Sequence, residues 1–576
     1  MKLLGCGVGN WDPVCRSAFL TCFAVLFVGA CGGGDGDTCT ASKISCGGEA
    51  TPGNDASVPD GGSAPDASAP QKETPDGSSC TTKPGPDVPD DDFADSNCDG
   101  IDGDKTKAIF VAPSGDDGAA GTFDRPVQSI SKAVALATTA AKDVYVCNGT
   151  YAGPVSITAA VSLYGGYDCV NGWRRINDRA TVAATTTTAL TIRGVMGPMT
   201  IDRLGFRSAD ALMPGESSIA ALIAGSTAVR IVHAMFEAGA GADGKPGDAV
   251  AARGPGPDGA QGEDLMRVNC YINAVTGDCA RYGAGGIGFA PGSPTADFCN
   301  LGAPGGHGAN GRANATTEPG QTIMNFLGES APGGAVGHEG SPGWDGKSGA
   351  AGVPAQSGFG SVTENGYAPT NIGTSGARGT FGISGGGGSG GLQGCAPSDC
   401  SITQQFYVGG GGGSGGSGGC GGTGGNPGGG GGASIGLLVI NSPNVTLAWT
   451  MFRTSNGGRG GSPSAGGAGG AGGKGGRGGT GTGVNGNPYG DGWAGGKGGN
   501  GGPGGPGGPA GGGPSIALLA KGSALMLTLP DYQTGIGGKG GRGIAGGDGA
   551  DGLTQDFALF GADGGFVAAD AGPSRD

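Results

Sequence analysis

The 576-residue sequence is poor in aromatic and charged residues, which make up only 6% and 14% of the chain. A single compact core of this size needs many bulky apolar side chains, so one large globular domain is not expected. Basic residues are also scarce: 33 Lys and Arg face 48 Asp and Glu, for a net charge of −15. An acidic surface repels phosphate backbones, and we expect no nucleic-acid partner.

Glycine is what the chain has in excess, with 139 residues, or about a quarter of the total, against about 7% in ordinary proteins. Much of it lies in Gly-Gly-X arrays within 237–432, 453–514 and 533–552. Such arrays suit either flexible low-complexity coil or extended left-handed helices with three residues per turn, as in polyglycine II. Strict collagen is disfavoured because Ala510 breaks the triplet.

An internal repeat separates these arrays. A short unit that begins with serine and ends with an aromatic residue occurs three times, at 218–236, 434–452 and 515–532. Leu222, Leu438 and Leu519 occupy one position of this unit, and Ile231 and Leu447 occupy another. Short strands cannot bury an apolar face alone, so the copies should stack as coils with these side chains pointing inward. Because each copy resumes the same register, the arrays are predicted to project from one edge of the stack.

The stretch from Ala108 to Cys169 predicts how this stack begins. Short apolar strands at 109–111, 144–147, 155–157 and 161–164 surround an amphipathic segment with Ile130, Ala133, Val134 and Ala137 at helical spacing. We therefore predict an all-β fold, a right-handed parallel β-helix with an N-terminal cap helix and large Gly-rich insertions. Strand pairs should continue at 189–192 and 199–206.

The same stretch resembles the opening of the DUF1565-type, pectate-lyase-like β-helix proteins. The residues that carry the resemblance are Pro113–Asp116, Gly121-Thr122, Pro126, Ser129-Ile130, Ala133, Val144–Val146, Gly149–Tyr151 and Val161–Tyr167. Proteins of this type are similar to myxobacterial surface lipoproteins, often with PGRS-like glycine arrays. The resemblance implies a fold and a location but no defined activity.

The N-terminus carries a predicted export signal. The run Ser17–Ala30 is apolar but, with 14 residues, too short to span a bilayer. It ends in Val28-Gly29-Ala30-Cys31, which resembles a bacterial lipobox with Cys31 as the lipidated residue. An ordinary cleaved signal and a buried apolar strand are the alternatives. We expect an exported protein held by its lipid to the outer membrane or cell surface.

The expected organisation follows from these features. It comprises a lipoprotein signal peptide (1–30), a disordered acidic Pro/Gly/Asp-rich tether (31–94), a metal-binding-like motif (95–104), the β-helix cap and first coils (105–236), a Gly-rich insertion (237–432), a coil (433–452), a Gly-Gly-X insertion (453–514), a coil (515–532), and a Gly-rich segment with the C-terminal tail (533–576).

The motif DSNCDGIDGD at 95–104 has the alternating oxygen ligands of a calcium loop. Candidate ligands are Asp95, Asn97, Asp99, Asp102 and Asp104. An EF-hand would place Glu at its twelfth position, where this chain has Thr106. The motif also resembles the metal-binding element that precedes β-helices in similar lipoproteins; an acidic end to an acidic linker is the alternative. No cofactor other than calcium is expected.

Sixteen cysteines are present, and twelve remain after the four in the leader, Cys6, Cys15, Cys22 and Cys31. An even number in an exported chain favours disulfides over free buried thiols. Local candidate pairs are Cys39 with Cys46, Cys80 with Cys98, Cys147 with Cys169, and Cys395 with Cys400. Sequence alone does not fix the connectivity.

No catalytic signature stands out. A charged loop could supply acid–base groups from Asp168, Arg174, Arg175, Asp178 and Arg179, although such loops are usually solvated. The histidines His233, His307 and His338 lack metal-ligand partners at useful spacing. Trp173, Trp344 and Trp493 could stack on sugar rings or anchor loops. We therefore expect a non-enzymatic, lipid-anchored surface protein with a structural, adhesive or matrix-binding role; a polysaccharide-active or carbohydrate-binding β-helix protein is the alternative.

Overall fold

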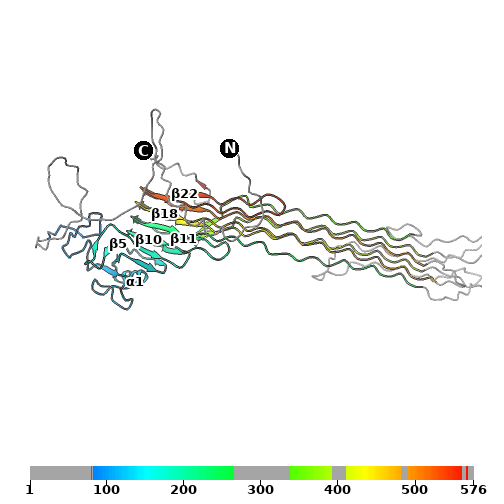
Figure 1. Cartoon of the computed structure of the whole chain (residues 1–576), viewed down its shortest axis with the longest axis horizontal. Coiled ribbons are helices and arrows are strands. Elements are labelled where there is room, and N and C mark those ends of the chain that lie inside the picture. Colours follow the sequence, from blue (N-terminus) through cyan, green and yellow to red (C-terminus); the bar gives the residue numbers. More distant parts are fainter. Residues whose placement is uncertain are drawn as a thin grey trace, which may run out of the picture. The chain divides into compact units, whose positions relative to one another are not determined.

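Short β-strands and one helix make up the regular secondary structure of the residues that the computed structural model describes (Figure 1). The structure describes residues 80, 82–264, 338–391, 410–481, 491–560 and 566–567, which belong to one unit, Ser78–Asp576. The predicted signal peptide, Cys31, most of the tether, the pairs Cys39–Cys46 and Cys395–Cys400, and His307 lie outside these residues. No helix in the described part is long and apolar enough to cross a membrane.

Three sheets of mostly parallel strands form the stem. The first contains β1 (Ala108–Val111), β2 (Asp143–Cys147), β5 (Leu163–Asp168), β9 (Met199–Asp202), β12 (Val229–Val232), β17 (Val445–Ala448) and β20 (Leu525–Thr528), with the short β6 (Arg174–Arg175) antiparallel to β5. The second contains β3 (Thr150–Ala152), β7 (Ala180–Ala183), β10 (Leu204–Arg207), β13 (Met235–Ala238), β18 (Met451–Thr454) and β21 (Asp531–Gln533). The third contains β4 (Val155–Ile157), β8 (Thr188–Arg193), β11 (Ser218–Ala224), β16 (Ser434–Ile440), β19 (Ser515–Lys521), β22 (Thr554–Phe560) and, antiparallel at its end, β23 (Phe566–Val567).

The chain visits the three sheets in turn, so each coil adds one strand to each sheet. The repeated units are in register: Ser218 pairs with Ser434, and Ser434 with Ser515. Phe236 pairs with Phe452, and their rings stack with centroids 5.8 Å apart. The predicted nearly all-β fold with parallel sheets is therefore present, and the intervening arrays leave the register of the coils unchanged.

One prediction about the core was wrong. Ile231 and Leu447 do lie in the central core, but Leu222, Leu438 and Leu519 pack on the other face of the third sheet, in a second apolar cluster. A hairpin of β14 (Ser361–Thr363) and β15 (Gly366–Ala368) contributes Val362 and Tyr367 to this cluster. Because both faces of this sheet are buried, its strands are continuous apolar runs, which do not reveal which side faces inward.

Helix α1 (Ile130–Ala140) forms where the sequence predicts it. Ser129 caps its N-terminus by accepting a hydrogen bond from the Lys132 N–H, and Ala141 ends it in the left-handed conformation. Its buried side chains, Ile130, Ala133, Val134 and Ala137, belong to the central core. The helix therefore lies against the first strands of the stack, as the prediction of an N-terminal cap requires.

A third apolar cluster lies on the outer face of the first sheet. Phe110, Tyr145 and Tyr164 occupy adjacent positions on β1, β2 and β5 and pack with Ile101 and other buried residues. Ile101 belongs to the segment 82–107, which we call the covering segment. Its Asp104 N–H donates to Tyr145 Oη over 3.0 Å, and its Asp102 carbonyl accepts from Tyr167 Oη over 2.7 Å. The covering segment is thus fastened to the stem rather than extended into solvent.

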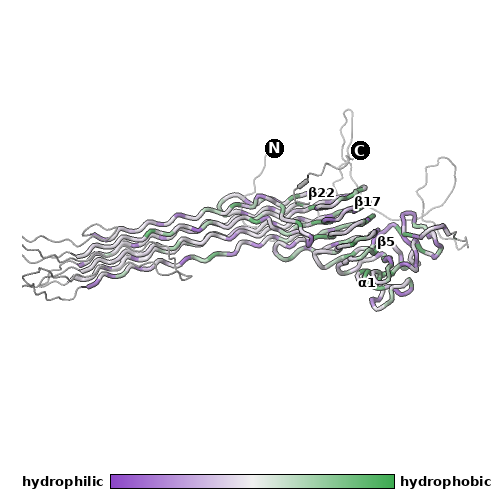
Figure 2. Tube along the Cα trace, turned by 180° about the vertical axis from the view of Figure 1, so that it is seen from behind, coloured by the Kyte–Doolittle hydropathy of each residue, from purple (hydrophilic) through white to green (hydrophobic). Residues whose placement is uncertain are grey.

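The glycine arrays run from the stem as a bundle of extended chains (Figure 1). In Figure 2 they appear mostly pale, whereas the strands of the stem carry more of the green hydrophobic segments. The segments of this glycine bundle are 239–264, 338–356, 369–391, 410–433, 455–481, 491–514 and 534–553.

Backbone hydrogen bonds between neighbouring segments recur at every third residue. In one parallel pair, the N–H groups of Gly340, Gly343 and Gly346 donate to the carbonyls of residues 494, 497 and 500 over 2.7–2.9 Å. In an antiparallel pair, Gly376 donates to Gly425 and Gly379 to Gly422, both over 2.9 Å. This triplet period matches the extended three-residue helix and excludes the flexible-coil interpretation for the described part of the arrays.

Close chain approach explains the glycine content of the bundle. Segment 410–433 bonds to four others, 239–264, 369–391, 455–481 and 491–514. A Cβ placed on Gly501 would lie 1.9 Å from the Cys420 carbonyl oxygen, far inside van der Waals contact. Aspartates at exposed positions of the bundle accept hydrogen bonds from amides of neighbouring segments: Asp243 accepts from the Arg459 N–H over 2.7 Å, and Asp258 from the Lys474 N–H over 2.7 Å.

Candidate functional site

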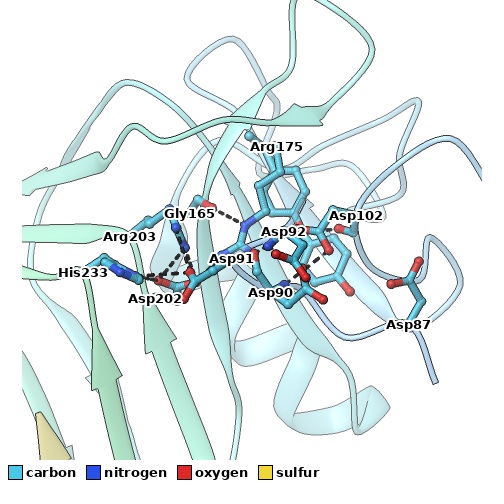
Figure 3. A network of polar contacts seen from close by, with 12 residues as sticks. Asp87, Asp90, Asp91, Asp92, Asp102, Gly165, Arg175, Asp202, Arg203 and His233 are labelled. Atoms are coloured by element: carbon cyan, nitrogen blue, oxygen red, sulfur yellow. Dashed lines mark hydrogen bonds and ion pairs between the residues drawn. The ribbon is translucent and has the colours of Figure 1, made fainter. Parts of the chain in front are cut away.

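The most concentrated group of buried charges lies where the covering segment meets the first sheet (Figure 3). We call it the arginine–aspartate cluster. Its members are Asp91 and Asp102 from the covering segment, Arg175 from β6, Asp202 from the end of β9, Arg203 from the following corner, and His233 from the corner after β12.

Arg175 is the centre of the cluster, and its side chain has no exposed surface. Its Nε donates to the Gly165 carbonyl over 3.1 Å. Nη1 donates to the Asp90 carbonyl over 2.9 Å and to Asp102 Oδ2 over 3.1 Å, and Nη2 donates to Asp202. A guanidinium in a low-dielectric site needs such partners on every nitrogen, and Arg175 has them.

Arg203 shares Asp202 with Arg175 and also pairs with Asp91. Nη1 donates to Asp202 Oδ2 and Nη2 to Asp91 Oδ1, each over 2.8 Å. The guanidinium also lies over the Phe93 ring, 4.8 Å from its centroid. Arg203 has φ of 51° because it alone forms the corner between β9 and β10, and this left-handed turn directs its side chain toward the covering segment.

His233 and Trp449 occupy the same corner in the next two coils, with φ of 49° and 48°. The His233 ring lies 3.2 Å from Asp202 Oδ1 through Nδ1 and 3.6 Å from Asp91 Oδ1. It also stacks on the Trp449 ring, with centroids 5.1 Å apart and planes 11° from parallel. Neither partner of His233 could be found from the sequence, because coil stacking brings Asp202 to it and the covering segment brings Asp91.

Burial governs the ionisation of Asp102. Desolvation raises its pKa to about 6, although the charge of Arg175 opposes the shift. Asp91 is more exposed: desolvation also raises its pKa, but the hydrogen bond from Arg203 and the neighbouring His233 charge outweigh it, and the net shift is downward. The two carboxyl groups of the covering segment therefore differ in environment although both face arginines.

Asp91, Asp202 and His233 are the one group of potential metal ligands that the described residues bring within 4.8 Å of one another. Two carboxylates and an imidazole suit a divalent transition metal. However, Arg203 donates to both carboxylates, and Arg175 donates to Asp202 as well. Two guanidinium groups already supply the positive charge at this position, so the arrangement acts as an ion-paired clamp that holds the covering segment on the stem.

The residues of the charged loop do not converge on a common point. Asp168 accepts hydrogen bonds from its own turn, including one from Asn171 Nδ2 over 2.6 Å. Arg174 is exposed, Arg175 is buried in the cluster, and Asp178 accepts from Asn148 Nδ2 over 3.2 Å. Only Arg175 enters the cluster, so these residues form no carboxylate pair open to a substrate.

The predicted calcium loop folds around its own backbone. Asp95 Oδ1 accepts from the Asp99 N–H over 3.1 Å and Oδ2 from the Gly100 N–H over 2.7 Å. Asn97 Oδ1 accepts from the Asp99 N–H over 2.8 Å. Asp95, Asn97 and Asp99 thus turn their side-chain oxygens toward backbone amides of the same loop. Carboxylate and amide oxygens are the ligands that calcium takes. The Lys105 ammonium donates to the Asp99 carbonyl, which puts a positive charge beside the loop.

The remaining candidates from the sequence are scattered. Asp102 belongs to the ion-paired cluster, and Asp104 accepts from the Thr106 N–H over 2.9 Å. Trp173 is buried in the cluster on the first sheet and anchors its loop. Trp344 and Trp493 are 77% and 41% exposed on the glycine bundle, where His338 lies 6.4 Å from the Trp493 ring.

The structure contains the disulfides Cys80–Cys98 and Cys147–Cys169, both among the pairs named from the sequence. The first joins Cys98, inside the predicted calcium-binding motif, to Cys80, just before the covering segment. The second joins the end of β2 to the loop after β5. Cys420, within the glycine bundle, is also disulfide-bonded.

Comparisons with known proteins do not assign this chain to a family. No family model matches the chain, and no curated protein matches it. Among solved structures, a mutant pectin methylesterase in complex with a hexasaccharide aligns with 22% of this chain and 42% of its own, at 17% identity and a TM-score of 0.17. A rhamnogalacturonan lyase aligns with 23% of this chain and 36% of its own, at 16% identity and a TM-score of 0.17. The alignments thus span less than half of either enzyme.

Proposed function

We propose that this protein is a non-enzymatic, lipid-anchored cell-surface protein in which the stem supports the glycine bundle as a rigid surface for adhesion or matrix contact. The observation that carries the proposal is the triplet hydrogen-bond register, which fixes seven chain segments side by side. Backbone hydrogen bonds between segments at every third residue leave the backbone little freedom. Outward side chains such as Trp344 and Lys347 are therefore held at regular spacing.

The charges of the described residues also favour a structural role. A general acid or base must reach its substrate, but the side chains of Asp102, Arg175 and Asp202 are 1%, 0% and 5% exposed. Each is already paired within the arginine–aspartate cluster. The cluster serves the attachment of the covering segment, and the adhesive surface belongs to the bundle.

Anchoring remains a proposal from the sequence. In it, Cys31 is lipidated after cleavage, the part of the predicted tether that precedes the covering segment extends from the membrane, and the chain is a DUF1565-type lipoprotein of myxobacterial kind with PGRS-like arrays. We further infer that the three sheets close into a right-handed solenoid. Cell fractionation with mass spectrometry of the mature N-terminus tests the anchor: a diacylated Cys31 in the outer-membrane fraction supports it, and an unmodified N-terminus in the medium contradicts it.

The adhesive role is tested by presenting the mature protein to a glycan array and to isolated cell-surface matrix. Binding without release of reducing ends or unsaturated products supports a non-enzymatic contact protein. Release of such products would favour the polysaccharide-active alternative. Absence of binding to either material would contradict the adhesive role.

A further inference from the structure

One disulfide lies where the chain enters the stem. Cys80 is bonded to Cys98, 18 positions later, and their Cα atoms are 5.6 Å apart. Cys98 belongs to the covering segment, whereas Cys80 precedes it. Any tension that reaches the stem from the N-terminal side of the chain therefore arrives at Cys80 and passes through the disulfide to Cys98.

The residues between the two cysteines contact the stem near its surface. The Asp91 side chain, which is 54% exposed, pairs with Arg203 over 2.8 Å. The Asp90 carbonyl accepts from Arg175 Nη1 over 2.9 Å. The Phe93 ring centroid lies 4.8 Å from the Arg203 guanidinium. Because exposed ion pairs contribute little to stability, this part of the covering segment should separate readily when it is pulled from its N-terminal end.

The residues that follow Cys98 are held more deeply. Ile101 is 1% exposed and belongs to the apolar cluster on the first sheet. Asp102 pairs with the buried Arg175 over 3.1 Å, and its carbonyl accepts from Tyr167 Oη over 2.7 Å. A buried aliphatic side chain and a buried, hydrogen-bonded ion pair cost more to separate than exposed contacts do. Tension on Cys98 has to break these contacts together, since they belong to adjacent residues.

The disulfide decides which of the two sets of contacts bears a load. With the bond closed, the residues between the cysteines form a loop beside the direct path, and their contacts meet no tension before Cys98 moves. Without the bond, the same tension would reach those contacts one after another. The path would then lengthen by about 54–59 Å, which is 18 positions at about 3.3–3.6 Å each less the 5.6 Å between the two Cα atoms. We call this lengthening the slack step.

We propose that the Cys80–Cys98 disulfide is a load-bearing staple, which carries tension from the N-terminal side of the chain directly into residues 98–107 and keeps it off the outer contacts of the covering segment. A protein that binds a surface by its glycine bundle and a membrane by its lipid is pulled along this path. The source of the load therefore rests on the proposed anchoring and adhesion, whereas the staple rests on the connectivity and contacts above.

The test applies a constant force between the N-terminus and position 196 of the full chain without its predicted signal peptide. Met196 is 77% exposed between β8 and β9, and an azide-bearing residue in its place takes the second handle. Magnetic tweezers record the first extension step beyond the stretching of the chain before Cys80. The variant is C80S/C98S. The matched control is C147S/C169S, which removes the disulfide between the end of β2 and the loop after β5.

We expect the slack step in C80S/C98S and in neither the wild type nor C147S/C169S. It should occur at least about tenfold faster than the first opening of the wild type, because the rate of forced opening follows the barrier of the contacts under load. Asp91→Asn should accelerate the slack step of C80S/C98S by about twofold to fivefold. In the wild-type background the same substitution should change the first opening by less than about twofold, since Asp91 lies outside the loaded path.

An insertion tests the load path without removing a cysteine. Gly85 is exposed, and a Cβ on it would meet nothing within 4 Å, so an insert of Gly and Ser can follow it without disturbing packing. About ten inserted residues should lengthen the slack step of C80S/C98S by about 33–36 Å. They should leave the first step of the wild type unchanged in length, because they lie inside the closed loop. This second comparison holds even if C80S/C98S fails to fold.

A slack step in the wild type, or a longer first step in the wild type with the insert, would overturn the staple. A folded C80S/C98S that opens like the wild type would overturn it as well. Each of these results would leave the proposed anchoring and adhesion standing. An unlipidated chain in the medium would contradict the anchoring, but the steps measured between the two handles would still support or overturn the staple.

Discussion

The rings of His233 and Trp449 stack with centroids 5.1 Å apart, although 216 residues separate them in the chain (449 − 233). The same offset relates Ser218 to Ser434, which pair in the third sheet (434 − 218). It also relates Asp243 to Arg459, which are joined by a hydrogen bond in the bundle (459 − 243). One coil of the stem and the first pair of bundle segments thus share a single register, so stem and bundle form one continuous hydrogen-bonded system.

This continuity makes interior glycines of the bundle sensitive to a single methyl group. Gly501→Ala should destabilise the bundle by about 1–3 kcal/mol, because the new Cβ would force segment 491–514 away from the Cys420 carbonyl and break its bonds. Gly254→Ala is the control, since its Cβ would meet nothing within 4 Å. Amide hydrogen exchange should show faster exchange in 491–514 only for G501A; equal protection in both variants would refute close packing there.

The free energy of unfolding should depend on Arg175, the centre of the arginine–aspartate cluster, much more than on the adjacent Arg174. Arg175→Met leaves the buried Asp102 and Asp202 with one cation fewer, which should lower the free energy of unfolding by about 3–5 kcal/mol. Arg174→Met, at an exposed position, should change it by no more than about 0.5 kcal/mol. Chemical denaturation measures both, and a small effect of R175M would mean that the covering segment is not held by this cluster.

The raised pKa of Asp102 predicts how the stability of the protein changes with pH. Burial raises the pKa of Asp102 to about 6 in the folded state, whereas an aspartate in the unfolded chain has a pKa of about 3.9. The folded state therefore binds the proton more tightly. Protonation therefore adds stability as pH falls from 7 through 6 toward 4, by about 1–3 kcal/mol. In Asp102→Asn this contribution is absent. The wild type should gain stability relative to D102N between pH 7.5 and pH 5; a gain in the opposite direction would show that Asp102 ionises readily in the fold.

The loop of Asp95, Asn97 and Asp99 predicts a response to calcium. Calcium should raise the melting temperature and a chelator should reverse the change, because the ion binds oxygens that the folded loop gathers. Asp95→Asn should abolish the shift. Asp124→Asn, at an exposed position outside the loop, should keep it. The same shift in D95N as in the wild type would exclude this loop as the binding site.

Lys105 offers an independent check of that loop. Its ammonium donates to the Asp99 carbonyl, so its positive charge lies near the loop and opposes the binding of a calcium ion. Lys105→Met should tighten calcium binding, measured by isothermal titration, by severalfold. Unchanged or weaker affinity in K105M would place the ion elsewhere.

Much of the fold was predictable because its signals are local. The strands of the repeated unit, the helix that carries Ile130 and Ala137, and the return of each coil to the same register follow from apolar spacing and turn residues. The position of Leu222 was not predictable, since a strand buried on both faces has no alternation that marks its inner side. The contacts of His233 with Asp91 and Asp202 were missed for a related reason: no spacing in the sequence joins a covering segment to a later coil.

By itself, the sequence determined that this chain forms short strands in repeating coils, because side-chain size and turn residues act on the nearest residues. It left the glycine arrays open between flexible coil and extended triplets, and the hydrogen bonds between segments decided for the triplets. Only the tertiary structure decided which chains lie next to each other. The pairing of Arg175 with Asp102 and Asp202 exists because successive coils and the covering segment meet in space. Coulomb interactions depend on distance through the fold rather than along the chain, so no local pattern records them.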